Sequence, residues 1–244
     1  MIGDVRVSRE DASGALIPYE TVGLRKIYGF SNRTVVGFAG DVDRAWRVLG
    51  SVNAYMRANG YDEPRLIYQL KGWVNDLCRH GDELTEVVRY QTDLLFLRTS
   101  IDPPTRVVVT SGVRVSLPSE RDEKPRVRSF FLTDHIGSGS GIPAYRQAVE
   151  EARKQLSGWA GFEQAMPGRG VSGQLVARGL SDVIMESKEA SVSPDVDICV
   201  LSARGVWAAG LRRSDPPLHV CQTWPEFQED SGDEGRRERM AIIG

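Results

Sequence analysis

The chain lacks the features that mark secreted, membrane-spanning and nucleic-acid-binding proteins. Its three cysteines, Cys78, Cys199 and Cys221, are odd in number and unclustered, so no disulfide framework is expected. No run approaches the roughly 20 apolar residues of a spanning helix, and the N-terminus has no signal-peptide pattern. Lysine and arginine number 31 against 33 acidic residues, which leaves no basic excess for a phosphate backbone. These absences predict a cytoplasmic protein with no membrane or nucleic-acid partner.

The usual signatures of cofactor and metal sites are also missing. The histidines, His80, His135 and His219, are scattered, with no acidic or cysteine spacing that predicts a metal site. A Gly-Ser run begins at Gly137, but the Gly-Lys-Ser/Thr of a phosphate loop does not follow it. We therefore expect neither a cofactor nor a metal.

What is present is enough hydrophobic sequence for one large domain. The chain has 244 residues, of which 41% are hydrophobic. We expect a single domain over residues 1–217. After Pro216 and Pro217 the chain becomes polar and charged, so residues 218–244 are predicted to be a poorly ordered C-terminal tail.

The periodicity of apolar residues predicts helices and strands in blocks. Asp41 is the expected N-cap of a helix that runs to Gly60, and further helices are expected at 66–77, 143–159 and 172–187. Expected strands are 4–8, 24–30, 34–38, 93–99, 106–109, 113–117, 127–132, 196–201 and 206–211, with loops at 8–20 and 118–125. This order is not a βαβ alternation. It favours an α+β fold, a four-layer αββα sandwich of two largely antiparallel sheets.

Four segments, in order, resemble the proteasome β-subunit and HslV-type peptidase family of the Ntn-hydrolase superfamily. The resemblance covers most of the chain up to residue 212 and implies the Ntn-hydrolase-like fold without its first strand, that is, N-terminally truncated. The four segments are residues 2–6, Lys26-Ile27 with residues 35–41, residues 136–140 leading to a helix with Tyr145, and residues 196–201.

The resemblance implies a set of residues that support catalysis. In that family an N-terminal residue supplies both the attacking hydroxyl and the amine that acts as base. By motif, Lys26 matches the lysine that lowers the pKa of the hydroxyl, Asp4 the acid that orients the lysine, and Ser138 the serine of the proton network. Arg25 is the alternative to Lys26, because the following turn is one residue short relative to HslV.

The last part of the implied network departs from the family pattern. The family has an aspartate followed three residues later by a serine or threonine. Here Glu189 could stand for the aspartate and Ser191 or Ser193 for the hydroxyl residue, but neither pairing keeps the spacing.

The printed sequence does not supply the nucleophile. Met1 is followed by bulky Ile2, so removal of the initiator methionine is not expected. No Gly-Thr or Gly-Ser pair for autoprocessing occurs ahead of Gly50. As written, the chain is predicted not to hydrolyse peptides by the threonine mechanism of the family.

Three functions therefore stay open. The first is a subunit of a self-compartmentalising threonine-type peptidase whose coding sequence starts upstream of Met1. The second is a non-catalytic structural or interaction subunit of a ring assembly. The third is an unrelated α+β binding domain. The resemblance implies a protein or peptide substrate, a homo- or hetero-oligomeric ring and an ATP-dependent unfoldase as partner.

Overall fold

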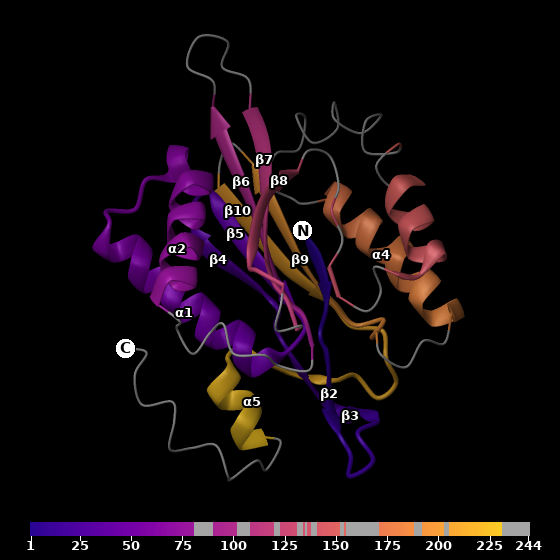
Figure 1. Cartoon of the computed structure of the whole chain (residues 1–244). Coiled ribbons are helices and arrows are strands. Elements are labelled where there is room, and N and C mark those ends of the chain that lie inside the picture. The colour runs from indigo at the N-terminus through magenta and orange to yellow at the C-terminus, as the bar shows by residue number, and fades with distance from the viewer. Residues whose placement is uncertain are drawn as a thin grey trace. The chain divides into compact units, whose positions relative to one another are not determined.

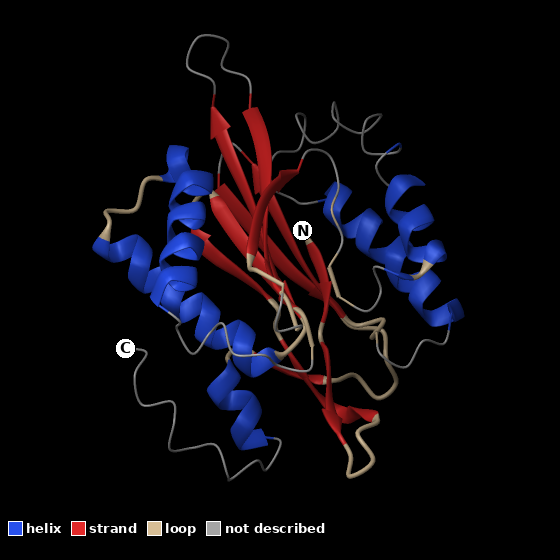
Figure 2. Cartoon of the chain, viewed as in Figure 1, coloured by secondary structure: helices blue, strands red, loops and turns tan. Residues whose placement is uncertain are grey.

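The computed structural model describes residues 1–80, 90–101, 108–119, 123–130, 134, 136–137, 141–151, 154, 171–187, 192–202 and 205–230. These residues form a mixed α/β structure with three β-sheets (Figures 1 and 2). The chain divides into two compact units, each described by itself below. The first unit comprises Met1–Tyr28, Ser138–Val200 and Val206–Gly244, and the second comprises Gly29–Gly137 and Leu201–Gly205.

Two three-stranded sheets belong to the first unit. One has the order β1 (Ile2–Asp4), β9 (Val196–Ser202), β10 (Gly205–Leu211), and the other has the order β11 (His219–Cys221), β3 (Leu16–Leu24), β2 (Arg6–Glu10). Strand β1 is antiparallel to β9 and β2 is antiparallel to β3, whereas β11 is parallel to β3.

Helix α4 (Val171–Ser187) packs its apolar side chains into the core of the first unit. Ala177 and Ile184 of α4 form one buried cluster with Tyr145 of the helical residues 143–151 and with Val196 and Ile198 of β9. Residues of β9 thus fill the core while its neighbour β1 carries Asp4.

The loop expected at residues 8–20 is wrong for most of its length. Strand β2 continues to Glu10 and β3 begins at Leu16, so only residues 11–15 turn the chain, with Gly14 at φ 80°. The side chains of Leu16 and Ile17 are 50% and 41% exposed, so this end of β3 lacks the alternating burial that a sequence pattern would reveal. Backbone pairing with β2 holds this end of the strand instead.

The structure also differs from the expected tail over residues 219–230. These residues form β11 and helix α5 (Trp224–Asp230), whose Trp224 and Phe227 are buried. The Phe227 ring meets the Tyr19 ring edge-on at 5.2 Å, so two aromatic side chains anchor an otherwise polar segment. Residues 231–244 lie outside the described residues. The single domain expected over residues 1–217 stays a prediction.

The second unit holds a five-stranded sheet with helices beside it. Its strands follow one another in chain order, β4 (Ile27–Ser31), β5 (Thr34–Ala39), β6 (Thr92–Ile101), β7 (Val108–Leu117) and β8 (Arg126–Phe130). Helix α1 (Val42–Ala58) contacts β5 and β6, and α2 (Leu66–His80), which follows the short 3-10 helix η1 (Glu63–Arg65), contacts β8 (Figure 1). The predicted N-cap is confirmed, since Asp41 Oδ1 accepts a hydrogen bond from Arg44 N at 2.7 Å.

The two faces of this sheet differ in character. Leu94 and Phe96 of β6 lie opposite Val115 and Val113 of β7, and all four are buried. Because successive residues of a strand point to opposite faces, the residues between them make up the other face. This second face is the more polar of the two, with Asp93 opposite Ser116, although Arg114 lies opposite the buried Leu95.

Strand β7 is continuous where two strands were expected, at 106–109 and 113–117. Gly112 lies opposite Phe130 of β8, and a Cβ atom on Gly112 would lie 2.0 Å from the Phe130 ring. The Phe130 ring therefore covers Gly112, and β7 stays paired with β8 at this position. From the sequence, the glycine was expected to interrupt the strand.

The described residues show three sheets where two were expected. The pairs β1–β9, β2–β3, β5–β6, β6–β7 and β7–β8 are antiparallel, whereas β11 is parallel to β3. The four-layer αββα arrangement and the N-terminal truncation stay predictions. None of the described helices has the length and apolar character to cross a membrane.

Candidate functional site

The structure brings together two of the residues that the sequence resemblance singles out. Lys26 follows β3 and Asp4 ends β1. The Lys26 Nζ atom lies 3.4 Å from Asp4 Oδ2 and donates to Arg6 O at 2.5 Å. The two side chains are 16% and 23% exposed, so the pair is largely enclosed but reachable from solvent.

Backbone hydrogen bonds fix both members of this Lys26–Asp4 pair. Asp4 Oδ1 accepts from Arg6 N at 2.9 Å, an Asx turn that orients the carboxylate where β1 passes into β2. Leu24 N donates to Val5 O at 2.8 Å, which ties the end of β3 to the same turn. The pair is therefore held at the point where β1, β2 and β3 meet.

Arg25, the alternative to Lys26, has a different partner. Its Nε lies 3.4 Å from Asp197 Oδ2, and Arg212 Nη2 donates to Asp197 Oδ1 at 2.7 Å. Asp197 lies opposite Gly3 in the β1–β9 register, whereas Asp4 lies opposite Val196. Because adjacent strand residues face opposite ways, Asp4 and Asp197 stand on different faces of the sheet. Lys26 is thus the cation that reaches Asp4.

Strand β1 pairs with β9 along one edge only. Cys199 N donates to Met1 O and Val5 N donates to Asp195 O, so Met1, Gly3 and Val5 turn their backbone groups toward β9. The backbone groups of Ile2 and Asp4 point to the other edge, where no strand of the described part of the chain pairs with them. The Lys26–Asp4 pair lies at the end of this edge.

The other predicted site residues are not brought to the pair by the described structure. Ser138, Glu189 and Ser191 lie outside the described residues. Ser193, the alternative to Ser191, is buried, and its Oγ accepts from Asp195 N at 3.0 Å. This hydrogen bond stabilises the turn that precedes β9.

Sequence reasoning missed Asp195, a fully buried carboxylate with several donors. Arg213 N donates to its Oδ1 at 2.5 Å and Ser214 N at 2.8 Å, and its Oδ2 accepts from Ser214 Oγ and from Leu218 N at 3.1 Å. Burial raises the pKa of Asp195, but the hydrogen bonds from Ser214, Arg213 and Leu218 outweigh burial and hold the pKa below its ordinary value. The donors lie 18 to 23 residues away in the sequence, so no local motif signals this role.

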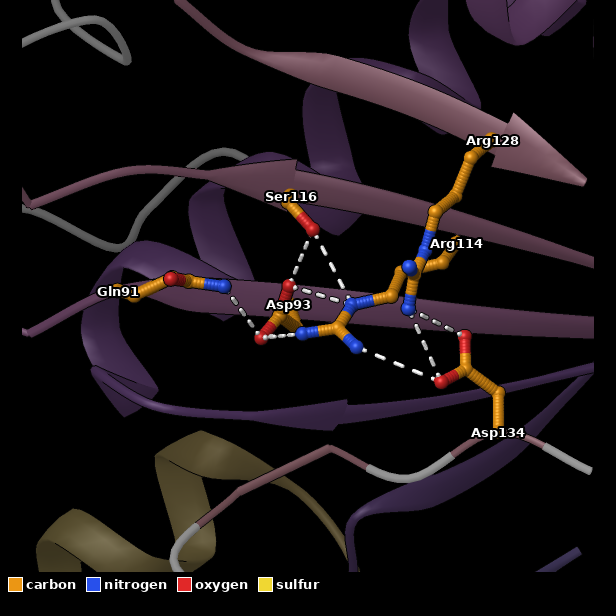
Figure 3. A network of polar contacts seen from close by, with 6 residues as sticks. All are labelled: Gln91, Asp93, Arg114, Ser116, Arg128 and Asp134. Atoms are coloured by element: carbon orange, nitrogen blue, oxygen red, sulfur yellow. Dashed lines mark hydrogen bonds and ion pairs between the residues drawn. The ribbon is translucent and has the colours of Figure 1, made fainter. Parts of the chain in front are cut away.

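A second polar cluster, on the polar face of the five-stranded sheet, was also missed. Asp93 accepts from Arg114 Nε at 3.0 Å and Nη2 at 2.8 Å, from Ser116 Oγ at 2.5 Å and from Gln91 Nε2 at 2.8 Å (Figure 3). The cluster extends to Asp134, which contacts Arg114 and Arg128. We call the six residues drawn in Figure 3 the arginine network.

Asp134 joins two arginines of the arginine network. Its Oδ1 lies 3.4 Å from Arg114 Nη1, and both of its oxygens lie 3.1 Å from Arg128 Nη2. Arg114 and Arg128 are directly opposite each other on β7 and β8, and like charges in that position repel. The shared carboxylate offsets this repulsion.

The chemistry available at the Lys26–Asp4 pair is electrostatic. An ammonium held by a carboxylate favours the deprotonated form of a hydroxyl, or the neutral form of an amine, placed beside it. Cys199 does not provide a reactive group, because it is buried and burial raises the pKa of its thiol. Within the described ranges, no group of three or more His, Cys, Asp or Glu side chains could hold a metal ion.

Comparison with known proteins finds matches among solved structures. No protein-family model matches the sequence, and no curated protein matches it. Among solved structures, the eukaryotic HslV of Trypanosoma brucei matches with a TM-score of 0.43 and 15% identity, covering 81% of this chain and 89% of that chain.

Proposed function

We propose that this chain is a proteasome- or HslV-like subunit of a self-compartmentalising threonine-type peptidase, with Lys26 and Asp4 in its supporting network. The observation that carries the proposal is the Lys26–Asp4 pair itself. Two residues chosen by motif, 22 positions apart, lie 3.4 Å from each other, while the rival Arg25 pairs with Asp197. The pair also stands beside an edge of β1 that no strand of the described residues pairs with.

In the proposed mechanism, an N-terminal threonine, serine or cysteine lies on a strand that pairs with the open edge of β1. Its hydroxyl or thiol attacks the peptide carbonyl, and its own α-amine accepts the proton. The charge of Lys26 lowers the pKa of the nucleophile, and Asp4 keeps the ammonium oriented. Ser138, Glu189 and Ser191 complete the proton network in this proposal. The printed sequence holds no such nucleophile, so we propose that it is inactive as it stands.

The proposal includes the assembly and its partners. A chamber peptidase acts on protein or peptide substrates inside a homo- or hetero-oligomeric ring, and an ATP-dependent unfoldase would deliver the substrate. The cytoplasm is the proposed location. No cofactor or metal enters the proposed reaction.

The deciding experiment starts from the coding DNA upstream of Met1. If the reading frame stays open to a threonine, serine or cysteine, the extended protein should cleave fluorogenic peptides while the chain from Met1 does not. Lys26→Ala in the extended protein should lower kcat by at least about 100-fold, a typical size for a proton-transfer group. Arg25→Ala is the matched control and should retain most activity. A stop codon directly before Met1 would rule out the catalytic form.

A second function is favoured by the hydrogen bonding of Lys26. Its ammonium is already satisfied by Arg6 O at 2.5 Å and by Asp4, so the pair is stable with no nucleophile present. This suits a non-catalytic subunit of a ring assembly. Light scattering on the chain from Met1 should then give a ring-sized mass without peptidase activity. A monomer at all concentrations, alone and with candidate partner subunits, would instead favour an unrelated α+β binding domain.

A further inference from the structure

A small cavity in the second unit adjoins the arginine network. Its volume is about 200 Å³, below the roughly 300 Å³ at which pockets for drug-sized ligands begin. Space of that size suits one functional group with a short stem. The residues of the lining that matter here are Gln91, Arg114, Glu123, Lys124, Arg126 and Arg128.

The lining of this cavity is basic, although the chain as a whole is slightly acidic. The formal net charge of the chain is −2. The cavity is lined by four cations, Arg114, Lys124, Arg126 and Arg128, and by one acid, Glu123. Asp93 and Asp134 of the arginine network bring the carboxylates to three. Among these described residues the cations exceed the carboxylates by one, which is the charge that a singly charged anion neutralises.

The buried part of the network holds the wall of the cavity in place. Asp93 is only 6% exposed and grips Arg114 with both carboxylate oxygens, a bidentate contact that fixes the guanidinium plane. Asp134 holds Arg128 less firmly, because both of its oxygens accept from the single nitrogen Nη2 and the Arg128 side chain is 59% exposed. Arg114 is therefore the part of the cavity wall that is fixed before any ligand arrives.

The outer cations are held much less firmly. Arg126 Nη2 lies 3.9 Å from Glu123 Oε1, and the two side chains are 72% and 49% exposed. An ion pair of that length and exposure is worth little, so Arg126 can turn to a competing anion at low cost. Arg126 and Arg128 are two residues apart on β8 and lie opposite Ser116 and Arg114, so both face the cavity side of the sheet.

We propose that this cavity binds a single carboxylate group, carried by a small organic acid or by the C-terminus of a peptide. The planar guanidinium of Arg126 matches a carboxylate with two parallel N–H donors, and Lys124 adds a point charge. The residual charge of one favours a monoanion over a phosphate dianion. This inference does not depend on the Lys26–Asp4 pair or on peptidase activity.

The binding test uses the full chain and four probes in isothermal titration calorimetry, one of which is inorganic phosphate as a dianion. N-acetylalanine represents a peptide C-terminus, acetate represents a small acid, and N-acetylalanine amide lacks the charge. N-acetylalanine should bind at least about tenfold more tightly than the amide, because a charge-assisted hydrogen bond is lost in the amide. Acetate binding as tightly as N-acetylalanine would identify a small acid as the ligand, and weaker acetate binding a peptide end. Equal affinity for acid and amide, or tighter binding of inorganic phosphate, would overturn the proposal.

Matched variants locate the binding to this cavity. Arg126→Ala should weaken N-acetylalanine binding about fivefold, while Glu123→Gln, which frees Arg126, should tighten it about twofold to threefold.

The controls are Arg65→Ala and Asp62→Asn, which alter a similarly exposed pair three residues apart in the same unit, at 3.6 Å. These change the net charge equally and should leave the affinity unchanged. Circular dichroism melts verify that each variant is folded. Equal effects in the control pair would show only long-range electrostatics and overturn the assigned site.

Discussion

The Lys26–Asp4 pair of the first unit and the Arg114–Asp93 pair of the second unit join opposite charges in different ways. Lys26 and Asp4 share one contact of 3.4 Å, and their side chains are 16% and 23% exposed. Arg114 and Asp93 share two contacts, of 3.0 and 2.8 Å, and Asp93 is 8% exposed at its side chain. The side chains of the two cations are equally exposed, at 16%, so the pairs differ in the number of their contacts and in the burial of the carboxylate.

The difference teaches that proximity of charges does not by itself mark a functional site. Removing one partner of a buried, bidentate arginine–carboxylate pair lowers the free energy of unfolding strongly, because the other charge is left buried without a counter-charge. A looser pair at a strand edge costs less to break and can serve a nearby reacting group. Free energies of unfolding of single variants measure this contrast.

The largest effect is expected for Asp93→Ala. This change removes both acceptors of Arg114 and the acceptors of Ser116 and Gln91, although Asp134 still offsets part of the charge. We expect the free energy of unfolding to fall by about 3 kcal/mol in urea titrations. Asp62→Ala, which breaks an exposed ion pair, is the control and should cost less than about 0.5 kcal/mol. Equal costs for the two variants would erase the contrast between buried and exposed pairs.

Asp195→Asn should come next, at about 2 kcal/mol, because its amide would turn donors toward backbone N–H groups. The sign of the pH dependence follows from the lowered pKa of Asp195. A carboxyl group whose pKa is lower in the folded state stabilises the fold above its unfolded pKa of about 3.9, and this contribution is lost as the pH falls through the folded value. Acid unfolding of Asp195→Asn should therefore show a shallower loss of stability below about pH 4. If the free energy of unfolding of Asp195→Asn fell as steeply at acid pH as that of the unchanged chain, Asp195 would not have the lowered pKa assigned to it.

A smaller effect is expected for Lys26→Met. Asp4 keeps its hydrogen bond from Arg6 N and remains partly hydrated, so the expected cost is about 1 kcal/mol. A double-mutant cycle with Asp4→Asn should give a coupling free energy of about 0.5 to 1 kcal/mol. A cost as large as that of Asp93→Ala would show that the pair is chiefly structural.

Arg25→Met should have the smallest effect, about 0.5 kcal/mol or less, because Asp197 keeps its 2.7 Å contact with Arg212. Its coupling with Asp4→Asn should be indistinguishable from zero in the same urea titrations. A coupling equal to that of Lys26 would mean that both cations serve Asp4 and would undo the assignment made from the strand faces.

Much of the local structure could be predicted from the sequence. The N-cap at Asp41, the helix that follows it and the apolar strands of the second unit follow from periodicity and capping, which depend on neighbouring residues. Strand β3 could not be predicted in this way, because its exposed Leu16 and Ile17 break the alternation and its stability comes from pairing with β2. Helix α5 could not be predicted either, because it lies in a polar stretch where Phe227 contacts Tyr19 of β3 and Trp224 stacks on Phe227.

The candidate site was predictable in part for the same reason. Lys26 and Asp4 each sit in a short motif, so resemblance to a known family could single them out. The arginine network and Asp195 had no such motif, since charged residues within strands look like a solvated face until their partners are known. Asp93, Arg114 and Asp134 are separated by about 20 residues at each step.

By itself, the sequence predicted that either Lys26 or Arg25 would pair with Asp4, and it determined where the helix after Asp41 begins. Only the tertiary structure decided between the two cations. Because of the pleat of β1 and β9, Asp4 and Asp197 lie on opposite faces of the sheet. After β3, Lys26 contacts Asp4 and Arg25 contacts Asp197. Local patterns set which groups are present, but the register between strands far apart in the chain sets which charges meet.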